Sequence, residues 1–368
     1  VDELLKIRIV WNLYRQGIKV ISLASGEPDF PTPPHAIEAA HQAALAGETK
    51  YPPQDGTKRL KEAVQRKFKR DNNLDYALDE IMVTNGGKQS IFNAFMATID
   101  PGDEVLIPAP FWISYAEMAK VAGGVPVTIN CPQNNGFKLR PEDLDAAITP
   151  KTKWVMINFP NNPTGAACSR DEMKAIAAVL MKHPHVWIMT DDMYEHLVFG
   201  DFEFTTPAQV EPSLYERTLT MNSFSKAYSI TGWRIGFLAG PAAIVEKCGI
   251  VFDQIEVCAS RPMQRGVQAA LEQLPDSFYD DLQRGYEKKR DVFCAALRDA
   301  GFRFQKPEGA YYVLADYGDV FGNVEPHPAV LQMIERIQIN AVPGHLFYGE
   351  PKGVRSMRFQ FAVEMPVL

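Results

Sequence analysis

The sequence lacks the long apolar runs and cysteine pairs that mark several common classes of protein. No run of 18 apolar residues occurs among its 368 residues, which excludes a membrane-spanning helix. The five cysteines are an odd number, and none belongs to a C-x-x-C pair. This pattern argues against a disulfide framework and a zinc site, so we expect no metal and a reducing, cytoplasmic compartment. No basic stretch followed by an apolar core and a cleavage site opens the sequence, so we expect no secretory signal.

An excess of positive charge is also missing. The 38 lysines and arginines are outnumbered by 45 aspartates and glutamates, and the net charge of −7 offers no broad cationic surface to nucleic acid or membrane lipid. Residues 58–70 contain seven basic side chains, but apolar residues also occur there at four-residue spacing, at Leu60, Val64 and Phe68. We therefore predict a helix with a buried apolar stripe and a solvated basic face, with nucleic-acid binding as a remote alternative.

Neither of the common nucleotide-binding motifs is present. No G-x-G-x-x-G follows a strand-like segment, and no G-x-x-x-x-G-K-[ST] occurs. A nicotinamide-dependent dehydrogenase and a P-loop nucleotidase therefore lose their main support in the sequence.

What the sequence does contain is an alternation of short apolar segments with longer helical ones. Strands are predicted at residues 80–84, 104–107, 125–129, 154–158, 186–190, 218–222 and 235–239. Helices are predicted between them, and a capping box of Ser169 and Glu172 opens one of these. Near-continuous apolar strands that are each followed by a helix indicate a mostly parallel sheet covered on both faces, so the fold class is α/β.

The pattern changes after about residue 241. Long helical stretches at residues 242–257, 261–274 and 277–300 precede strand-like segments at 310–316 and 356–362. This succession indicates a second, α+β unit built mainly from the C-terminal third of the chain.

Four polar segments follow predicted strands and carry the candidate chemistry. Residues 84–89 read TNGGKQ, residues 158–165 NFPNNPTG, residues 189–194 MTDDMY and residues 222–236 NSFSKAYSITGWRIG. Open α/β sheets bind ligands at the carboxyl ends of their strands, where a glycine turn into a helix suits an anion and a lysine suits a Schiff base. Taken singly, each segment also fits a β-turn, a helix cap or a surface lysine.

Together, their order and spacing resemble the pyridoxal-phosphate enzymes of fold type I, in particular the class I aminotransferases of the aspartate aminotransferase family. The segments N-x-P-N-N-P-T-G and S-x-S-K-x-x-x-x-T-G-W-R-I-G are specific, and the resemblance runs from SLASGEPDF at residues 22–30 to RFQFA at residues 358–362. It implies a large domain at residues 30–275 with a mostly parallel seven-stranded sheet. The smaller α+β domain would be formed by residues 1–29 and 276–368.

The resemblance also implies a cofactor site. Lys226 would hold pyridoxal 5'-phosphate as an internal aldimine and move the proton of the substrate α-carbon. Asp191 would pair with the pyridine nitrogen, and Asn162 and Tyr194 would hydrogen-bond the phenolic oxygen of the ring. The other implied cofactor contacts are the backbone of Gly87 and Lys88 and the side chains of Ser223, Ser225 and Arg234 at the phosphate, and Trp112 stacked on the ring. A core tryptophan is the alternative for Trp112.

For the substrate, the resemblance implies a fork of two hydrogen bonds from Arg358 to the α-carboxylate, beside Trp112 and Asn162. Gly26 would let a backbone N–H approach the same carboxylate. Tyr51 would reach the phosphate of a neighbouring subunit, which implies a homodimer with shared sites. The implied activity is ping-pong transfer of an amino group from an L-amino acid to a 2-oxo acid, in amino-acid metabolism or biosynthesis.

Two other functions remain open at this point. A carbon–sulfur lyase or another eliminating enzyme would use the same cofactor residues, because the cofactor supplies the electron sink and the protein selects the bond that breaks. A non-enzymatic ligand sensor is a further alternative, against which the intact Lys226, Asp191 and Arg358 argue.

The preferred substrate also remains open. Residues 256–265 depart from the pattern that relatives commonly carry near the substrate pocket, and Thr190-Asp191-Asp192 stands where Ser-Asp-Glu is common. Arg261 or Arg265 is a candidate ligand for the distal carboxylate of a dicarboxylic substrate. A position on a helix surface is the interpretation that we favour for both.

Overall fold

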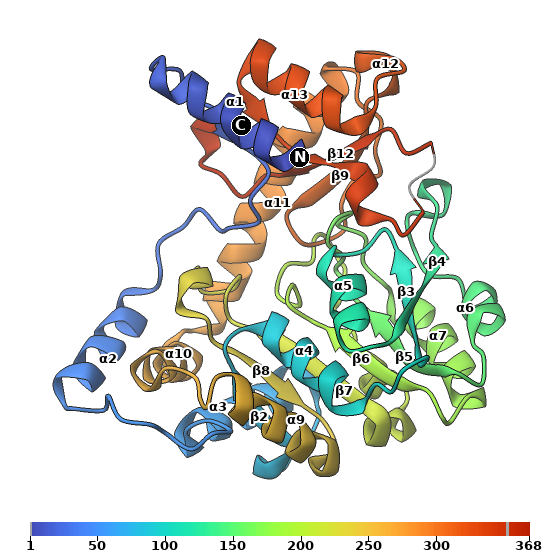
Figure 1. The fold of residues 1–368 in the computed structure, drawn as a ribbon. Helices are drawn as coiled ribbons and strands as arrows, with labels where there is room; N and C mark the ends of the chain where they lie inside the picture. The colour runs from blue at the N-terminus through green and yellow to red at the C-terminus, as the bar shows by residue number, and fades with distance from the viewer. Residues whose placement is uncertain (1, 351–352) are drawn as a thin grey trace.

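The computed structural model describes residues 2–350 and 353–368, with side chains from residue 8 onward. Its centre is a seven-stranded sheet (Figure 1). The strands are β2 (Ile81–Thr84), β3 (Glu104–Ala109), β4 (Val125–Asn130), β5 (Thr152–Ile157), β6 (Trp187–Asp191), β7 (Thr218–Ser223) and β8 (Gly236–Ala239). They lie in the order β2-β8-β7-β6-β5-β3-β4, and β8 alone runs antiparallel to its neighbours in this sheet. The predicted α/β fold class with a mostly parallel seven-stranded sheet is confirmed.

Helices cover both faces of this sheet, which explains why the strands are apolar on both sides. In β3, Val105 and Ile107 belong to one core cluster with Phe95, whereas Leu106 belongs to another with Ile176. Alternate side chains of a strand point to opposite faces, so each face of β3 meets a different helix. The helices are α1 (Asp2–Arg15), α2 (Pro34–Leu45), α3 (Lys58–Lys67), α4 (Gly87–Thr98), α5 (Ser114–Val121), α6 (Pro141–Ala147), α7 (Arg170–Lys182), α8 (Pro207–Val210), α9 (Ala242–Ile255), α10 (Arg261–Gln273), α11 (Asp276–Asp299), α12 (Gly318–Phe321) and α13 (Pro326–Ile337).

The two ends of the chain meet beside a second, smaller sheet (Figure 1). Its antiparallel strands are β11 (Val342–Pro343), β12 (Ser356–Gln360) and β9 (Tyr312–Asp316), and β1 (Ile21–Ser22) pairs separately with β10 (Ile339–Asn340). Leu23, from the N-terminal end, packs in the same core cluster as Tyr312 and Phe359. The chain ends thus share one α+β region, and the boundaries between residues 29 and 30 and between 275 and 276 stay predictions.

Two local expectations need correction. The strand expected from residue 310 begins at Tyr312, because Ala310 has a left-handed φ of +54° that no extended strand adopts. The helix expected over residues 58–70 ends as an α-helix at Lys67 and continues as a π-helical turn, Phe68–Asn72. Within the described part of the chain, no helix is long and apolar enough to cross a membrane.

Candidate active site

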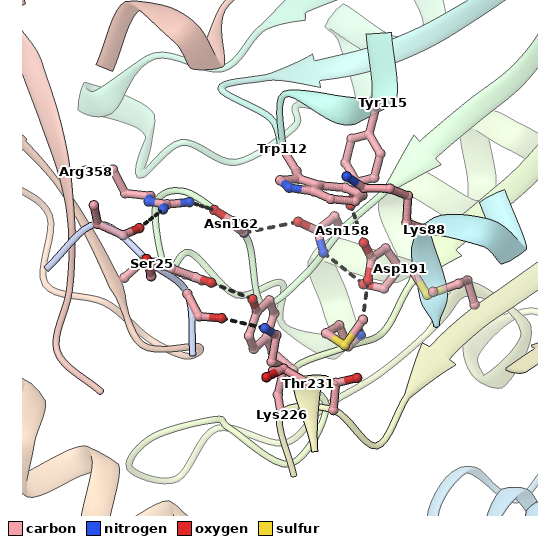
Figure 2. A pocket seen from close by; sticks show the side chains of 18 of the residues that line it. Ser25, Lys88, Trp112, Tyr115, Asn158, Asn162, Asp191, Lys226, Thr231 and Arg358 are labelled. Atoms are coloured by element: carbon pink, nitrogen blue, oxygen red, sulfur yellow. Dashed lines mark hydrogen bonds between the residues drawn. The ribbon is translucent and has the colours of Figure 1, made fainter. Parts of the chain in front are cut away.

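A cavity of about 390 Å³ lies at the carboxyl ends of the parallel strands, between the large sheet and β12 (Figure 2). It collects most of the residues that the sequence singled out. The predicted site residues that line it are Gly26, Gly87, Lys88, Trp112, Asn162, Asp191, Tyr194, Ser225, Lys226, Arg234 and Arg358. Residues that the sequence analysis did not assign to the site complete the lining: Ala24, Ser25, Tyr115, Asn158, Met193, Met221, Thr231 and Tyr312.

Asp191 ends strand β6 and presents a buried carboxyl group to the cavity. The Tyr115 hydroxyl donates to its Oδ2, and the backbone N–H of Met193 donates to its Oδ1 at 3.3 Å. Burial raises the pKa of Asp191 to about 6, although these two hydrogen bonds and the charge of Lys226 oppose the rise. No residue in the described chain forms an ion pair with this carboxylate, so a cation entering the cavity would stabilise it.

Lys226 follows strand β7 and extends its amine into the same cavity. Its Nζ donates a hydrogen bond of 2.5 Å to the backbone carbonyl of Gly26, in the segment that follows β1. Because the partner is a neutral carbonyl rather than a carboxylate, an incoming electrophile or anion can compete for this amine.

The start of α4 places free backbone N–H groups and a cation at one corner of the cavity. Gly86, with φ +90°, turns the chain into the helix, so the first N–H groups of α4 have no intrahelical partner. A side chain at Gly86 would collide with the Arg234 guanidinium, and one at Gly87 would collide with Met221. Arg234 itself donates to the carbonyls of Thr231 at 2.9 Å and Asn85 at 3.2 Å. The two glycines therefore allow a cation and a free helix N-terminus to approach the same point.

Ser223 and Ser225 occupy different positions relative to the cavity. Ser225 lines it, whereas Ser223 is buried behind it. The Ser223 hydroxyl donates to the Ile235 carbonyl at 2.8 Å and therefore accepts from the Ser225 hydroxyl, also at 2.8 Å. Ser223 thus orients the hydroxyl of Ser225, and its direct contact with a phosphate stays a prediction.

Arg358, on strand β12, is a buried cation at the opposite end of the cavity from Asp191 (Figure 2). Its Nη1 donates to Asn162 Oδ1 at 2.9 Å and its Nη2 to the Ala24 carbonyl at 2.5 Å. Its Nε is buried without a hydrogen-bond partner. The guanidinium lies between the rings of Tyr312 and Phe347, at 4.6 and 5.1 Å from their centroids. The two aromatic rings thus restrict the orientation of the guanidinium group, and the Nε–H group is left available to an acceptor in the cavity.

A continuous chain of hydrogen bonds joins Arg358 to Asp191 along the wall of the cavity (Figure 2). Asn162 accepts from Arg358, its backbone N–H donates to Asn158 Oδ1 at 3.1 Å, and Asn158 Nδ2 donates to the Asp191 carbonyl at 2.9 Å. The position of Arg358 relative to the backbone of Asp191 is therefore fixed by directional bonds as well as by apolar packing.

Comparison with known proteins agrees with this geometry. The sequence profile of the family "Aminotransferase class I and II" matches residues 18–365. The chain belongs to this family. It is 50% identical over 309 residues to an aspartate/prephenate aminotransferase of Cereibacter sphaeroides, with 83% of this chain and 76% of the relative covered. It is 44% identical to an aspartate aminotransferase of Rhizobium meliloti, with 94% of this chain and 87% of the relative covered.

Solved structures give the same result. A crystal structure of the Rhizobium meliloti aspartate aminotransferase is similar with a TM-score of 0.92 at 42% identity, covering 100% of this chain and 93% of that one. The aspartate aminotransferase of Thermus thermophilus with maleate gives a TM-score of 0.91 at 35% identity, covering 99% and 92%. The chain is thus an aminotransferase, and this family depends on pyridoxal phosphate in general. The lyase alternative is not favoured.

Three polar residues of this aminotransferase site gave little signal in the sequence. Tyr115 and Tyr312 are aromatic residues in a helix and a strand, where the usual interpretation is core packing. Asn158 belongs to the NFPNNPTG segment, from which the resemblance singles out only Asn162. The one signal was position, since Asn158 directly follows β5 at the ligand-binding edge of the sheet.

Tyr51, Arg261 and Arg265 lie outside the main cavity. They line a separate depression with Glu48, and Tyr51 is 82% exposed. Arg261 Nε lies 3.3 Å from a carboxylate oxygen of Glu48, and Arg265 donates to Gln268 at 2.6 Å. Neither arginine therefore reaches the substrate region of its own chain, and the contact of Tyr51 with a second subunit stays a prediction.

Behind the site, the expectation of a wholly solvated basic face on α3 is wrong at Lys67. This side chain is 1% exposed, and its Nζ lies 2.5 Å from Glu195 and 2.8 Å from Asn72 Oδ1. The other carboxylate oxygen of Glu195 accepts from Asn222 Nδ2 at 2.5 Å. Since Glu195 follows Tyr194 and Asn222 lies at the end of β7, this buried ion pair ties together the two strand ends that carry the site.

Proposed function

We propose that the chain binds pyridoxal 5'-phosphate covalently through Lys226 and transfers an amino group between an acidic L-amino acid and a 2-oxo acid by a ping-pong mechanism. The observation that carries the proposal is that the Lys226 amine, the Asp191 carboxyl group and the Arg358 guanidinium face one cavity. When bound, the cofactor supplies an electron sink for the pair left by the departing α-proton. The residues of the chain bind, orient and move protons around it.

The donor set fits this cofactor at both ends. Asp191 is a buried carboxyl group with a raised pKa and no ion-pair partner among the described residues, and a protonated pyridine nitrogen would supply one. The N-terminus of α4 and Arg234 offer N–H and guanidinium donors to a phosphate dianion, and Ser225 would join them by turning its proton from Ser223 toward the phosphate. Half-buried Trp112 lies between these ends and would cover one face of the ring.

The chemistry then divides among a few side chains. Lys226 Nζ would accept the proton from the α-carbon of the amino acid and deliver it to the adjoining carbon of the cofactor. Asn162 and Tyr194 would donate hydrogen bonds to the phenolic oxygen of the ring. Arg358 would bind the α-carboxylate, because its unpartnered Nε and its Nη2 offer the two parallel donors that a carboxylate needs.

An acidic substrate is supported by the relatives and by Lys88. The relatives above are named for aspartate, and the Thermus thermophilus enzyme was solved with maleate, a dicarboxylate. The Lys88 side chain lines the cavity with its Nζ 5.0 Å from the centroid of the Trp112 ring, and it forms no ion pair in the described part of the chain. We assign this ammonium group to the second carboxylate of the substrate.

Two further features of the proposal concern assembly and location. We assign Tyr51 to the phosphate of a partner subunit in a homodimer, because a largely exposed tyrosine beside two arginines is free to make such a contact. We assign the protein to the cytoplasm, because its five cysteines are all free thiols.

An absorbance experiment tests the function. Purified protein is loaded with pyridoxal phosphate, freed of excess cofactor, and given aspartate without any oxo acid. We expect aspartate to convert the visible cofactor band to that of the aminated cofactor, and Lys226→Ala to bind the cofactor without this conversion. Undiminished transamination by Lys226→Ala would overturn the assignment of Lys226, and release of ammonia or pyruvate in place of conversion would favour a lyase.

Lys88→Met tests the substrate class in the same assay. The variant keeps the backbone N–H at the phosphate corner and removes only the ammonium group. We expect a higher KM for aspartate and an unchanged KM for alanine. Equal changes for both amino acids would remove Lys88 from the recognition of the second carboxylate.

A further inference from the structure

Tyr312 is placed where it contacts three parts of the site at once. Its hydroxyl lies 2.8 Å from the hydroxyl of Tyr194, and its ring lies under the guanidinium of Arg358. The same hydroxyl lies so close to Gly26 that a side chain there would collide with it. Tyr312 is buried, on strand β9, and its register partner on β12 is Gln360, two residues from Arg358.

The bond between the two hydroxyls constrains where the proton of Tyr194 points. A phenol has one proton to donate and can accept through its lone pairs. If Tyr194 donated to Tyr312, it would have no proton left for a ligand in the cavity. Only when Tyr312 is the donor is the Tyr194 proton free to point into the cavity.

We infer that Tyr312 is a positioning residue that donates to the Tyr194 hydroxyl and thereby aims the Tyr194 proton at the phenolic oxygen of the bound cofactor. This inference rests on the proposed function. The aromatic ring of Tyr312 has a separate role, which is to hold the guanidinium plane of Arg358 for the substrate carboxylate. The hydroxyl of Tyr312 thus acts on the cofactor through Tyr194, and its ring acts on the substrate through Arg358.

The two roles predict different defects. In Tyr312→Phe the ring stays and the donor is lost. A hydroxyl that accepts a hydrogen bond is a stronger donor, so without Tyr312 the hydrogen bond from Tyr194 to the phenolic oxygen weakens. Donation to that oxygen favours its deprotonated form, so we expect the pH midpoint of the visible cofactor band to rise by about 0.5–1 pH unit. In Tyr312→Leu the ring is lost as well, and we expect the KM for aspartate to rise about fivefold above that of Tyr312→Phe.

A double-mutant cycle separates this role from a merely structural one. Pyridoxal-phosphate-loaded wild type, Tyr312→Phe, Tyr194→Phe and the double variant are titrated from pH 5 to pH 10 by absorbance. If Tyr312 acts through Tyr194, the double variant has the same midpoint as Tyr194→Phe alone. The matched control is Tyr317→Phe, since Tyr317 lies in the same core cluster, does not line the cavity, and donates its hydroxyl to the Val324 carbonyl. We expect its midpoint to equal that of wild type.

The outcomes distinguish the inference from the function on which it rests. A wild-type protein without a visible band after loading would overturn both. A normal wild-type band with an unshifted midpoint in Tyr312→Phe would overturn the role of Tyr312 and leave the aminotransferase proposal intact. Additive shifts in the double variant, or an equal shift in Tyr317→Phe, would also overturn it, because the effect would then not pass through Tyr194.

Discussion

Replacing Asp191 with asparagine should make the cofactor-free protein more stable at pH 8 and less stable at pH 4. Burial raises the pKa of this carboxyl group from its ordinary value of 3.8 to about 6. Between these values the folded state holds a proton that the unfolded state has lost, so the stability of the wild type falls as the pH rises. At about 1.4 kcal/mol per pH unit, the loss amounts to about 3 kcal/mol and is complete above about pH 7.

Asparagine removes this pH dependence but also loses a hydrogen bond. Asp191 accepts from Tyr115 on one oxygen and from Met193 on the other, and an amide offers only one acceptor oxygen. The lost bond costs about 1 kcal/mol at every pH. The variant should therefore be less stable than wild type by about 1 kcal/mol well below pH 3.8, about equally stable near pH 4.5, and more stable by about 2 kcal/mol at pH 8.

Urea denaturation of the cofactor-free proteins at half-unit steps from pH 3.5 to pH 8 measures this difference. Asp145→Asn is a control of opposite sign, because a hydrogen bond from His183 lowers the pKa of that exposed carboxyl group. Asp145 therefore stabilises the fold above its unfolded pKa, and its variant should gain nothing at pH 8. A difference between Asp191→Asn and wild type that does not change between pH 4.5 and pH 8 would refute the argument from burial.

Two further substitutions test the buried cations. Arg358→Lys should raise the KM for amino donors about tenfold or more, because one ammonium replaces a two-pronged fork; steady-state kinetics with aspartate measure this, and an unchanged KM for every donor would remove Arg358 from the site. Lys67→Met should lower the free energy of unfolding by about 3–5 kcal/mol, because Glu195 is left as an unpaired buried charge. Adding Glu195→Gln should recover part of that loss in urea denaturation, and no recovery would mean that the ion pair does not carry the effect.

The sequence predicted the parts of the site that local chemistry marks. Glycine pairs, asparagine-proline turns and carboxylates after apolar strands mark candidate segments, and the combined order of these segments, through the family resemblance, singles out residues such as Gly87, Asn162 and Asp191. The strands could be predicted because both faces of the sheet are covered, which leaves uninterrupted apolar runs.

Residues whose role depends on long-range contacts could not be found in this way. Tyr312 lies in an apolar strand, where a tyrosine is expected in the core, and only the packing of β9 brings its hydroxyl to Tyr194. Lys67 belongs to a run of basic residues on one helix, and its burial depends on Glu195, which is 128 positions away in the sequence. Neither contact leaves a local pattern.

The backbone of residues 24–26 supplies hydrogen-bond acceptors to both Arg358 and Lys226 when no ligand is bound. The Ala24 carbonyl accepts from Arg358 and the Gly26 carbonyl accepts from Lys226, each at 2.5 Å. Both cations are thus held by neutral acceptors of one short segment. Carboxylates are stronger acceptors than carbonyls, so a substrate carboxylate would replace the bond from Arg358 to Ala24 with stronger bonds, and the cofactor would replace the bond from Lys226 to Gly26. The substrate affinity is then a difference between two sets of hydrogen bonds, which keeps binding reversible in a site that must release its product after each half-reaction.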